Sequence, residues 1–373
     1  MTPARIGILH GIERQFPPAL AERINVLGAG RVVATPVQIG LVRQDELPRY
    51  DLILDRISHE VPFYRTWLKA AAVRGTHVVN NPFWWSADDK FVGNLIALDA
   101  GVAVPRTVLV PHKHHPPNTR SDSFVNLEAP LDWEAMFAYL GFPIFLKPAY
   151  GGGWRDVHRC DFPGAFFEAY DQTRDLLMIA QEGIAFSDYY RCYGLGRERV
   201  RLMPYDPSQP FERRYVRDGR EIPPERRERL ERDCLALCRA LGYDFNTLEF
   251  AVREDVPYAI DFMNPAPDCD RFSVGDDHFE WVLSNAADLL IERALNPRPL
   301  ELTGSWPERA ERPPTVTESA PRSEIAGPRS RAAPEAGAEP APAAAEKPAT
   351  PASRRPRAEP SAGKPPAAKP RRR

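Results

Sequence analysis

The sequence has few cysteines, and their arrangement argues against a disulfide-stapled secreted domain. Five cysteines are scattered over 373 residues, at Cys160, Cys192, Cys234, Cys238 and Cys269. An odd, dispersed set predicts buried thiols in a reducing compartment. Cys234 and Cys238 lie in one predicted helix, but no second pair or neighbouring histidine completes a zinc site.

Long apolar runs are also missing. No stretch approaches the roughly 20 apolar residues that cross a bilayer, and residues 1–10 lack the apolar core of a signal peptide. No G-x-G-x-x-G follows the first predicted strand, so a dinucleotide site is not supported there. These absences predict a cytoplasmic protein with no membrane partner.

Proline, by contrast, is abundant, and its distribution divides the chain. Of 40 prolines, 15 lie in residues 301–373, together with 17 alanines and almost no large aliphatic residues. Such a segment cannot bury enough apolar surface to offset its chain entropy, so we expect a disordered tail over residues 300–373. The tail holds 14 Lys and Arg against 9 Asp and Glu, a charge of +5, and the net charge of −2 therefore leaves −7 on residues 1–300. A basic tail is compatible with an acidic partner.

Residues 1–85 alternate short β-rich and helical segments. Strands are predicted at 5–10, 31–39, 51–57 and 76–80, and helices at 18–27 and 64–74. This alternation is typical of an α/β domain with a parallel sheet. Beyond it, the pattern predicts a helix over 88–100 capped by Ser86 or Asp88, a strand over 104–110 and a loop over 111–130. The loop carries His112, His114 and His115 without a carboxylate at ligand spacing, which favours an exposed loop over a metal site.

The apolar segment 142–146 leads into Lys147 and then into the turn Gly151-Gly152-Gly153. A lysine within an apolar strand is costly to bury unless an anion pairs with it. Glycines next to it let backbone N–H groups approach a phosphate. By itself the segment fits a phosphate-binding strand and a strand-end lysine that reaches solvent equally well.

Two later segments favour phosphate binding. Residues 176–184 form an apolar strand that ends in Gln181-Glu182, polar groups suited to a base and a ribose. Residues 247–252 and 258–265 predict two strands joined by a tight turn, which places Glu249, Asp261 and Asn264 on adjacent strands. Carboxylate and amide oxygens suit Mg²⁺. The alternative, surface carboxylates on an edge hairpin, is weakened by the apolar residues around them.

Taken in order, these motifs resemble those of the ATP-grasp carboxylate–amine ligases. The motifs are Asp88-Asp89-Lys90, Gly101–Thr107, Leu146-Lys147-Pro148 with its glycines, Gln181-Glu182-Gly183-Ile184, and Asp261 with Asn264-Pro265. The resemblance covers residues 1–297. Within the superfamily, the sequence is similar to the branch that contains glutathione synthetase, D-alanine–D-alanine ligase and the ribosomal-protein glutamate ligases. It implies an N-terminal parallel-sheet domain (1–85), a linker helix and central ATP-grasp lobe (86–185), a C-terminal lobe with a metal site (186–299) and then the tail.

The resemblance also implies roles for individual residues. The residues matching those that hold ATP are Lys90 and Lys147 with the loop Gly151, Gly152 and Gly153 for the phosphates, Gln181, Glu182 and Ile184 for adenine, and Asp188 for ribose. Arg191 matches an arginine that faces the acyl phosphate and acts in catalysis with Lys147. Glu249, Asp261 and Asn264 match the ligands of Mg²⁺, or of Mn²⁺ in its place.

One departure from the family concerns the last strand. Relatives usually have Glu-x-Asn there, whereas this chain has one more residue between Asp261 and Asn264. Either a β-bulge restores a common face for the ligands, or Asp261 does not bind metal.

Two further segments have open alternatives. Arg213 and Arg214 could grip a substrate carboxylate, although a solvated basic turn also explains them. Phe83-Trp84-Trp85 could line an acceptor site or pack in a core. The helix predicted over 224–241 carries Leu230, Cys234, Leu237 and Leu241 on one face, which indicates packing.

The resemblance implies ADP-forming ligation of a carboxylate to an amine through an acyl phosphate. The substrates would be ATP with small-molecule or peptide carboxylates and amines, and a homodimer is compatible with the sequence. The alternatives are a nucleotide-binding scaffold that has lost catalysis and an ATP-grasp kinase that stops after phosphorylation. The joint presence of Lys90, Lys147, Glu249 and Asn264 favours an active site over the scaffold.

Overall fold

The computed structural model describes residues 2–45, 50–83, 89–217 and 219–298. The predicted tail (300–373), the predicted caps Ser86 and Asp88, and the pair Trp84-Trp85 lie outside the described residues. Three four-stranded sheets occupy successive parts of the described chain. No helix among the described residues is both long and apolar enough to cross a membrane.

The first sheet is parallel, as the strand–helix alternation predicts, and its order is β2-β1-β3-β4. Its elements are β1 (Ala4–Leu9), α1 (Phe16–Gly28), β2 (Val32–Pro36), β3 (Leu52–Asp55), α2 (Pro62–Val73) and β4 (His77–Val79). All four residues of β3 are buried, which is typical of a central strand with both faces covered. Both helices have proline in the first turn, where its missing N–H costs no hydrogen bond.

The second sheet is antiparallel with the order β5-β8-β6-β7. Its elements are β5 (Thr107–Val110), α4 (Trp133–Leu140), β6 (Ile144–Pro148), β7 (His158–Cys160), α5 (Pro163–Gln172) and β8 (Met178–Glu182). The segment predicted as a loop over 111–130 contains only a short 3-10 turn, η2 (Ser121–Phe124). The preceding helix, α3 (Lys90–Asp99), starts after Asp89, whose carboxylate accepts the N–H groups of Phe91 and Val92.

The third sheet is antiparallel with the order β10-β9-β11-β12. Its elements are β9 (Asp188–Leu195), β10 (Arg199–Pro204), η3 (Phe211–Arg213), α6 (Pro224–Ala240), β11 (Phe245–Arg253), β12 (Val256–Asp261), α7 (Arg271–Val274) and α8 (Asp276–Leu295). The predicted tight turn between β11 and β12 is confirmed, with Glu254 and Asp255 both at positive φ. The leucine and cysteine face of α6 is buried, as predicted, and all five cysteines are buried and free.

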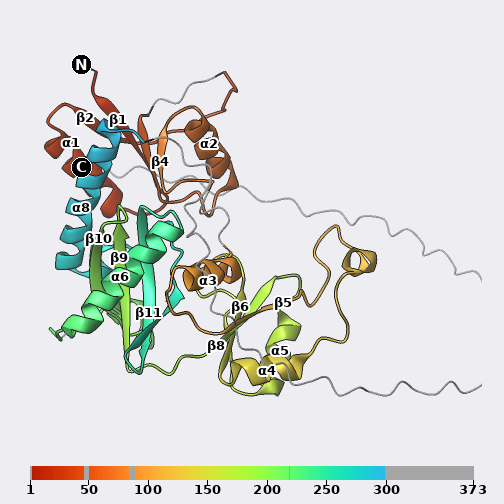
Figure 1. Ribbon diagram of the computed structural model, residues 1–373. Helices are drawn as coiled ribbons and strands as arrows, with labels where there is room; N and C mark the ends of the chain where they lie inside the picture. Colours follow the sequence, from red (N-terminus) through yellow and green to blue (C-terminus); the bar gives the residue numbers. More distant parts are fainter. Residues whose placement is uncertain (1, 46–49, 84–88, 218, 299–373) are drawn as a thin grey trace, which may run out of the picture. The chain divides into compact units, whose positions relative to one another are not determined.

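One hydrophobic core joins the first sheet to the third. Its buried residues come from β1–β4, α1, β9, β11 and α8, and α8 packs along α1 (Figure 1). Asn80 closes this contact, because its amide donates to the Phe245 carbonyl at 2.7 Å and accepts the Asp244 and Phe245 N–H groups at 2.8 Å. The N-terminal sheet is therefore anchored to the strand that carries Glu249.

Candidate functional site

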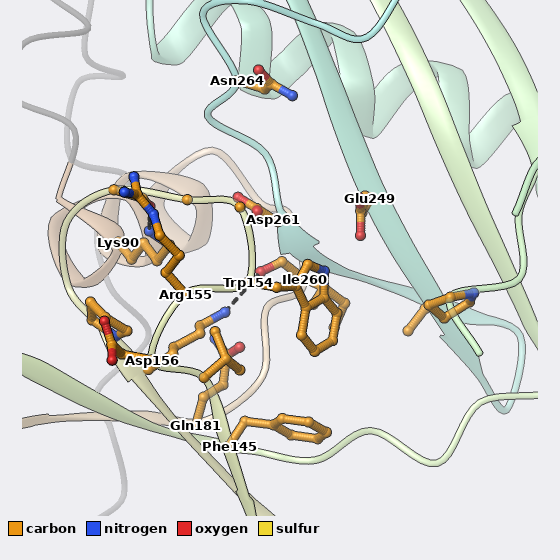
Figure 2. A pocket seen from close by; sticks show the side chains of 18 of the residues that line it. Lys90, Phe145, Trp154, Arg155, Asp156, Gln181, Glu249, Ile260, Asp261 and Asn264 are labelled. Atoms are coloured by element: carbon orange, nitrogen blue, oxygen red, sulfur yellow. Dashed lines mark hydrogen bonds between the residues drawn. The ribbon is translucent and has the colours of Figure 1, made fainter. Parts of the chain in front are cut away.

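A cavity of about 820 Å³ lies between residues of the second and third sheets. It brings together most of the side chains that the sequence singles out, although they come from positions 90 to 264 of the chain. The predicted site residues that line it are Lys90, Lys147, Gly151, Gly152, Gly153, Gln181, Glu182, Ile184, Arg191, Arg214, Glu249, Asp261 and Asn264. Figure 2 shows several of these side chains pointing into the same space.

Lys147 is a buried cation, 9% exposed, near the end of β6. Its Nζ donates to the carbonyl oxygen of Ile260 on β12 at 3.4 Å. Burial lowers the pKa of Lys147 to about 8, with the charge of Lys90 adding to the effect and that of Asp261 opposing it. Burial of the charged ammonium group is unfavourable, so an anion that enters the cavity would stabilise the charged form of Lys147.

Lys90 approaches the same end of the cavity from the start of α3. Its backbone N–H donates to the Ala149 carbonyl at 3.0 Å, and its Nζ donates to the Gly151 carbonyl. These bonds tie the first turn of the helix to the glycine turn after β6. Gly151 and Gly153 have φ of +80° and +74°, which glycine adopts without steric cost.

The segment at the end of β8 contributes two polar side chains that already have partners. Gln181 donates to the Thr107 hydroxyl at 3.1 Å. Glu182 accepts from Arg106 at 3.0 Å and from Arg253 at 2.8 Å. Burial would raise the pKa of Glu182, but the hydrogen bonds from both arginines outweigh it and lower the pKa. The Glu182 carboxylate therefore links the residue before β5 to the end of β11, and both of its oxygens are bound by arginines.

Apolar side chains form the wall beside this segment. They are Phe145, Leu176, Ile184 and Phe186, and Figure 2 shows Phe145 next to Gln181. An apolar wall with a few polar groups at its edge is typical of a site for a planar, partly apolar ligand such as a nucleobase.

A β-bulge on β12 lies just before Asp261, so it sets the facing of Asp261 relative to Glu249 and does not concern the additional residue between Asp261 and Asn264. Glu249 pairs with Asp261, but the next pair is Phe250 with Ala259, so Ile260 is the extra residue. Residues directly opposite each other in an antiparallel pair share one face. The bulge therefore places Glu249 and Asp261 on the same face, toward the cavity.

Of the two carboxylates, Glu249 and Asp261, Glu249 has the stronger hydrogen-bond partners. The Tyr189 hydroxyl donates to its Oε2 at 2.6 Å, and the nearest guanidinium nitrogen of Arg191 lies 3.7 Å from its Oε1. Burial raises the pKa of Glu249, and the neighbouring Asp261 raises it further, although Arg191 opposes both. A divalent cation between the two carboxylates would relieve this repulsion.

Asn264 lies beyond β12, in the chain that Figure 2 traces away from Asp261. Its amide donates to the Thr247 hydroxyl at 3.0 Å, and its backbone N–H donates to Asn246 at 2.9 Å. Its Oδ1 accepts only a long bond from the Ala266 N–H, at 3.3 Å. Asn264, Glu249 and Asp261 all line the cavity, and amide and carboxylate oxygens are ligands that suit Mg²⁺ or Mn²⁺. No group of three or more His, Cys, Asp and Glu suited to a metal occurs among the described residues.

Two arginines face the part of the cavity next to Glu249. Arg191 is buried, and its guanidinium lies 3.5 Å from the Tyr205 hydroxyl and 3.4 Å from that of Thr247. Arg214 donates through Nε to the Gln209 carbonyl at 2.9 Å and lines the cavity. The structure separates Arg214 from its neighbour Arg213, which does not line the cavity.

Asp188 is also placed away from the main cavity. Its carboxylate accepts from Arg226 at 2.8 Å and lies 3.8 Å from Arg220. It lines a smaller cavity of about 330 Å³, which shares Phe186, Tyr189 and Tyr205 with the main one. The structure therefore places Asp188 outside the cavity that collects most of the other predicted site residues.

Several lining residues have no counterpart in the sequence prediction. Tyr189 comes from β9 and Tyr205 directly follows β10, and neither strand was predicted. Trp154 and Arg155 follow the three glycines directly. Their proximity to a predicted phosphate loop is the one sequence signal that could have identified them.

Comparison with known proteins supports this interpretation of the fold. No protein-family model matches the chain. D-alanine–D-alanine ligase of Dechloromonas aromatica (strain RCB) is 27% identical over 194 residues, which represent 48% of this chain and 58% of that ligase. The chain thus spans little more than half of this curated relative.

Solved structures extend the likeness over a larger part of the chain. D-alanine–D-alanine ligase from Bacillus anthracis complexed with ATP superimposes with a TM-score of 0.54 at 17% identity, covering 78% of this chain and 97% of that one. A RimK domain protein with an ATP-grasp fold, from Sphaerobacter thermophilus DSM 20745, gives 0.55 at 18% identity, covering 77% and 100%.

Proposed function

The chain has the ATP-grasp fold that its sequence motifs predict, and from this premise we propose that it is an ATP-dependent, ADP-forming ligase. It would join a carboxylate to an amine through an acyl phosphate. The observation that carries the proposal is the cavity itself, in which Lys90 and Lys147 from one side meet Glu249 and Asp261 from the other. Such an arrangement suits a metal-bound polyphosphate.

In this proposal the second sheet binds the nucleotide. Lys90 and Lys147 neutralise the phosphates, and the turn at Gly151–Gly153 lets its backbone approach them closely. The apolar wall around Phe145 and Ile184 receives the base. The carboxylate of Glu182 acts indirectly, because its bonds to Arg106 and Arg253 hold the end of β8 in place.

The third sheet would hold the metal and the acceptor. Glu249, Asp261 and Asn264 are the residues that would bind Mg²⁺, which when bound neutralises phosphate charge. Tyr189 orients the Glu249 carboxylate through its 2.6 Å hydrogen bond. Arg191 and Arg214 provide positive charge where the substrate carboxylate must approach the terminal phosphate.

The proposed reaction has two steps. A carboxylate oxygen attacks the terminal phosphorus of ATP, the bond from that phosphorus to the bridging oxygen breaks, and ADP leaves. The nitrogen of the amine then attacks the acyl carbon, phosphate leaves, and the amine gives up a proton. The lysines and arginines position the reactants and stabilise charge, so no nucleophilic side chain is needed.

The test is ADP release by the full chain with Mg²⁺ and a panel of amino acids, peptides and polyamines. A ligase releases ADP only with its carboxylate substrate and forms an amide when the amine is added. Stable phosphorylation of one substrate without an amide would indicate a kinase. Nucleotide binding without turnover on any substrate would support the scaffold alternative. Absence of nucleotide binding would overturn the proposal.

A further inference from the structure

The loop between β6 and β7 contains strained residues in addition to its glycines. Trp154 and Asp156, which are not glycine, have φ of +60° and +53°. Left-handed backbone of this kind is unfavourable for residues other than glycine. Strain of this kind in a cavity-lining loop is commonly retained for a function. The two strained residues flank Arg155.

Open space lies over the same loop. A side chain added at Gly151, Gly152 or Gly153 would meet no atom within 4 Å. The glycines are therefore not required by packing against the rest of the protein. Room above a glycine-rich turn is suited to close approach of a ligand to the backbone.

Arg155 is exposed and lines the cavity, yet it forms no hydrogen bond or ion pair with any residue that the structure describes. Asp156 lines the cavity too, but it does not pair with Arg155. Arg159, four residues later on β7, differs in both respects, because it pairs with Asp161 at 3.0 Å and does not line the cavity.

The position of Arg155 places it at the phosphate end of the cavity. Figure 2 shows Arg155 with Lys90 and Asp261 toward one end, and Phe145 with Gln181 toward the other. Lys90 and Lys147 both donate to backbone carbonyl oxygens. The lowered pKa of Lys147 reflects burial and the neighbouring charge of Lys90. A third cation here suits a ligand with several negative charges.

We propose that Arg155 is a catalytic residue that binds the terminal phosphoryl group of ATP during its transfer. A planar guanidinium can donate to two phosphoryl oxygens at once, and its charge stabilises those oxygens as the phosphoryl group moves from ADP to the carboxylate. Arg155 itself neither gains nor loses a proton. This inference rests on the proposed function, since it assumes that the cavity holds ATP.

The test compares Arg155→Ala, Arg155→Lys and Arg159→Ala in the full chain. The affinities of ADP and of a non-hydrolysable ATP analogue are measured with Mg²⁺ by calorimetry, and ADP release is measured with an active substrate. We expect Arg155→Ala to weaken analogue binding about tenfold and ADP binding about twofold or less, as removal of one exposed charge-assisted contact predicts. Turnover should fall about a hundredfold. Arg155→Lys should recover part of both losses, and Arg159→Ala should change neither.

The outcomes separate this inference from the proposed function. If the wild type binds the analogue and Arg155→Ala binds it equally well, the role of Arg155 is wrong while the ligase proposal stands. Equal losses for ADP and the analogue, or equal losses in Arg155→Ala and Arg159→Ala, would also overturn it. If the wild type binds neither nucleotide, the proposed function fails and the inference fails with it.

Discussion

The second and third sheets contribute charged side chains of both signs to one cavity, but in different arrangements. The part of the chain around the second sheet contributes Lys90, Lys147 and Arg155 at one end, whereas the part around the third sheet contributes Glu249 and Asp261 beside Arg191 and Arg214. Neither set is balanced by the other at salt-bridge distance, and the lowered pKa of Lys147 and the raised pKa of Glu249 both reflect burial of an incompletely compensated charge. This arrangement suits the ligand proposed above, a polyphosphate with a divalent cation.

The two sides also differ in how firmly their groups are held. Glu249 has a 2.6 Å hydrogen bond from Tyr189 and a neighbouring guanidinium. Lys147 has a single long bond, at 3.4 Å, to a backbone carbonyl. Glu249 is therefore held in place in advance, whereas Lys147 remains available to a ligand. The following predictions test this contrast.

The largest effect is expected from Lys147→Met. Methionine fills a similar volume without a buried charge, so stability should be unchanged or higher. Nucleotide affinity should fall about a hundredfold, because a buried charge-assisted contact to phosphate is lost. Calorimetry and thermal unfolding measure the two effects. Unchanged nucleotide affinity in a folded variant would show that Lys147 does not bind the phosphates.

Glu249→Gln should chiefly affect the response to metal. We expect ADP release to fall about tenfold or more, and to require higher Mg²⁺, because one anionic oxygen ligand becomes neutral. Glu254→Gln, at the exposed turn of the same hairpin, is the matched control and should behave as the wild type. The measurement is ADP release over a Mg²⁺ titration, and an identical Mg²⁺ dependence in Glu249→Gln would argue against the metal site.

Arg214 and its neighbour Arg213 provide a variant and a matched control for the part of the cavity where the substrate carboxylate is proposed to bind. Arg214 lines the cavity and Arg213 does not, so Arg214→Ala should raise the KM for the carboxylate substrate about tenfold, the value of one exposed charged contact. Arg213→Ala should leave it unchanged. Steady-state kinetics on both variants provide the comparison, and equal effects would contradict the geometric distinction.

A smaller effect on nucleotide affinity is expected when the pH is raised. The pKa of Lys147 is about 8, lowered by burial, and phosphate binds its charged form. The ammonium is present below about pH 7 and is lost as the pH rises through about 8, so affinity should fall about tenfold between about pH 7 and pH 9. Lys147→Met should not show this decline. A wild-type affinity that stays constant or rises over this range would contradict it.

The smallest effect is expected from removing residues 301–373. Every residue that lines the cavity lies between Lys90 and Asn264, so nucleotide affinity and the unfolding temperature should be unchanged. Calorimetry on the truncated and full chains measures this. A clear loss of stability would show that the segment packs on the rest of the protein.

Much of the site could be predicted from the sequence because its signals are local. A lysine in an apolar strand before three glycines indicates an anion site wherever that strand packs. β9 was missed for a physical reason, since it pairs with β10 and β11 and all but its first residue is buried. Such a strand shows no alternation of polar and apolar residues along its length.

The parallel first sheet, the buried face of α6, the turn between β11 and β12 and most of the charged residues at the site follow from the sequence alone. Which of these charges remain available depends on tertiary contacts. Arg106 and Arg253 bind Glu182, and Arg226 binds Asp188, from positions far along the chain. A bulge at Ile260 sets the facing of Asp261. Periodicity reports which face of an element is buried, but the partner of a charge depends on contacts between distant segments, which no local pattern contains.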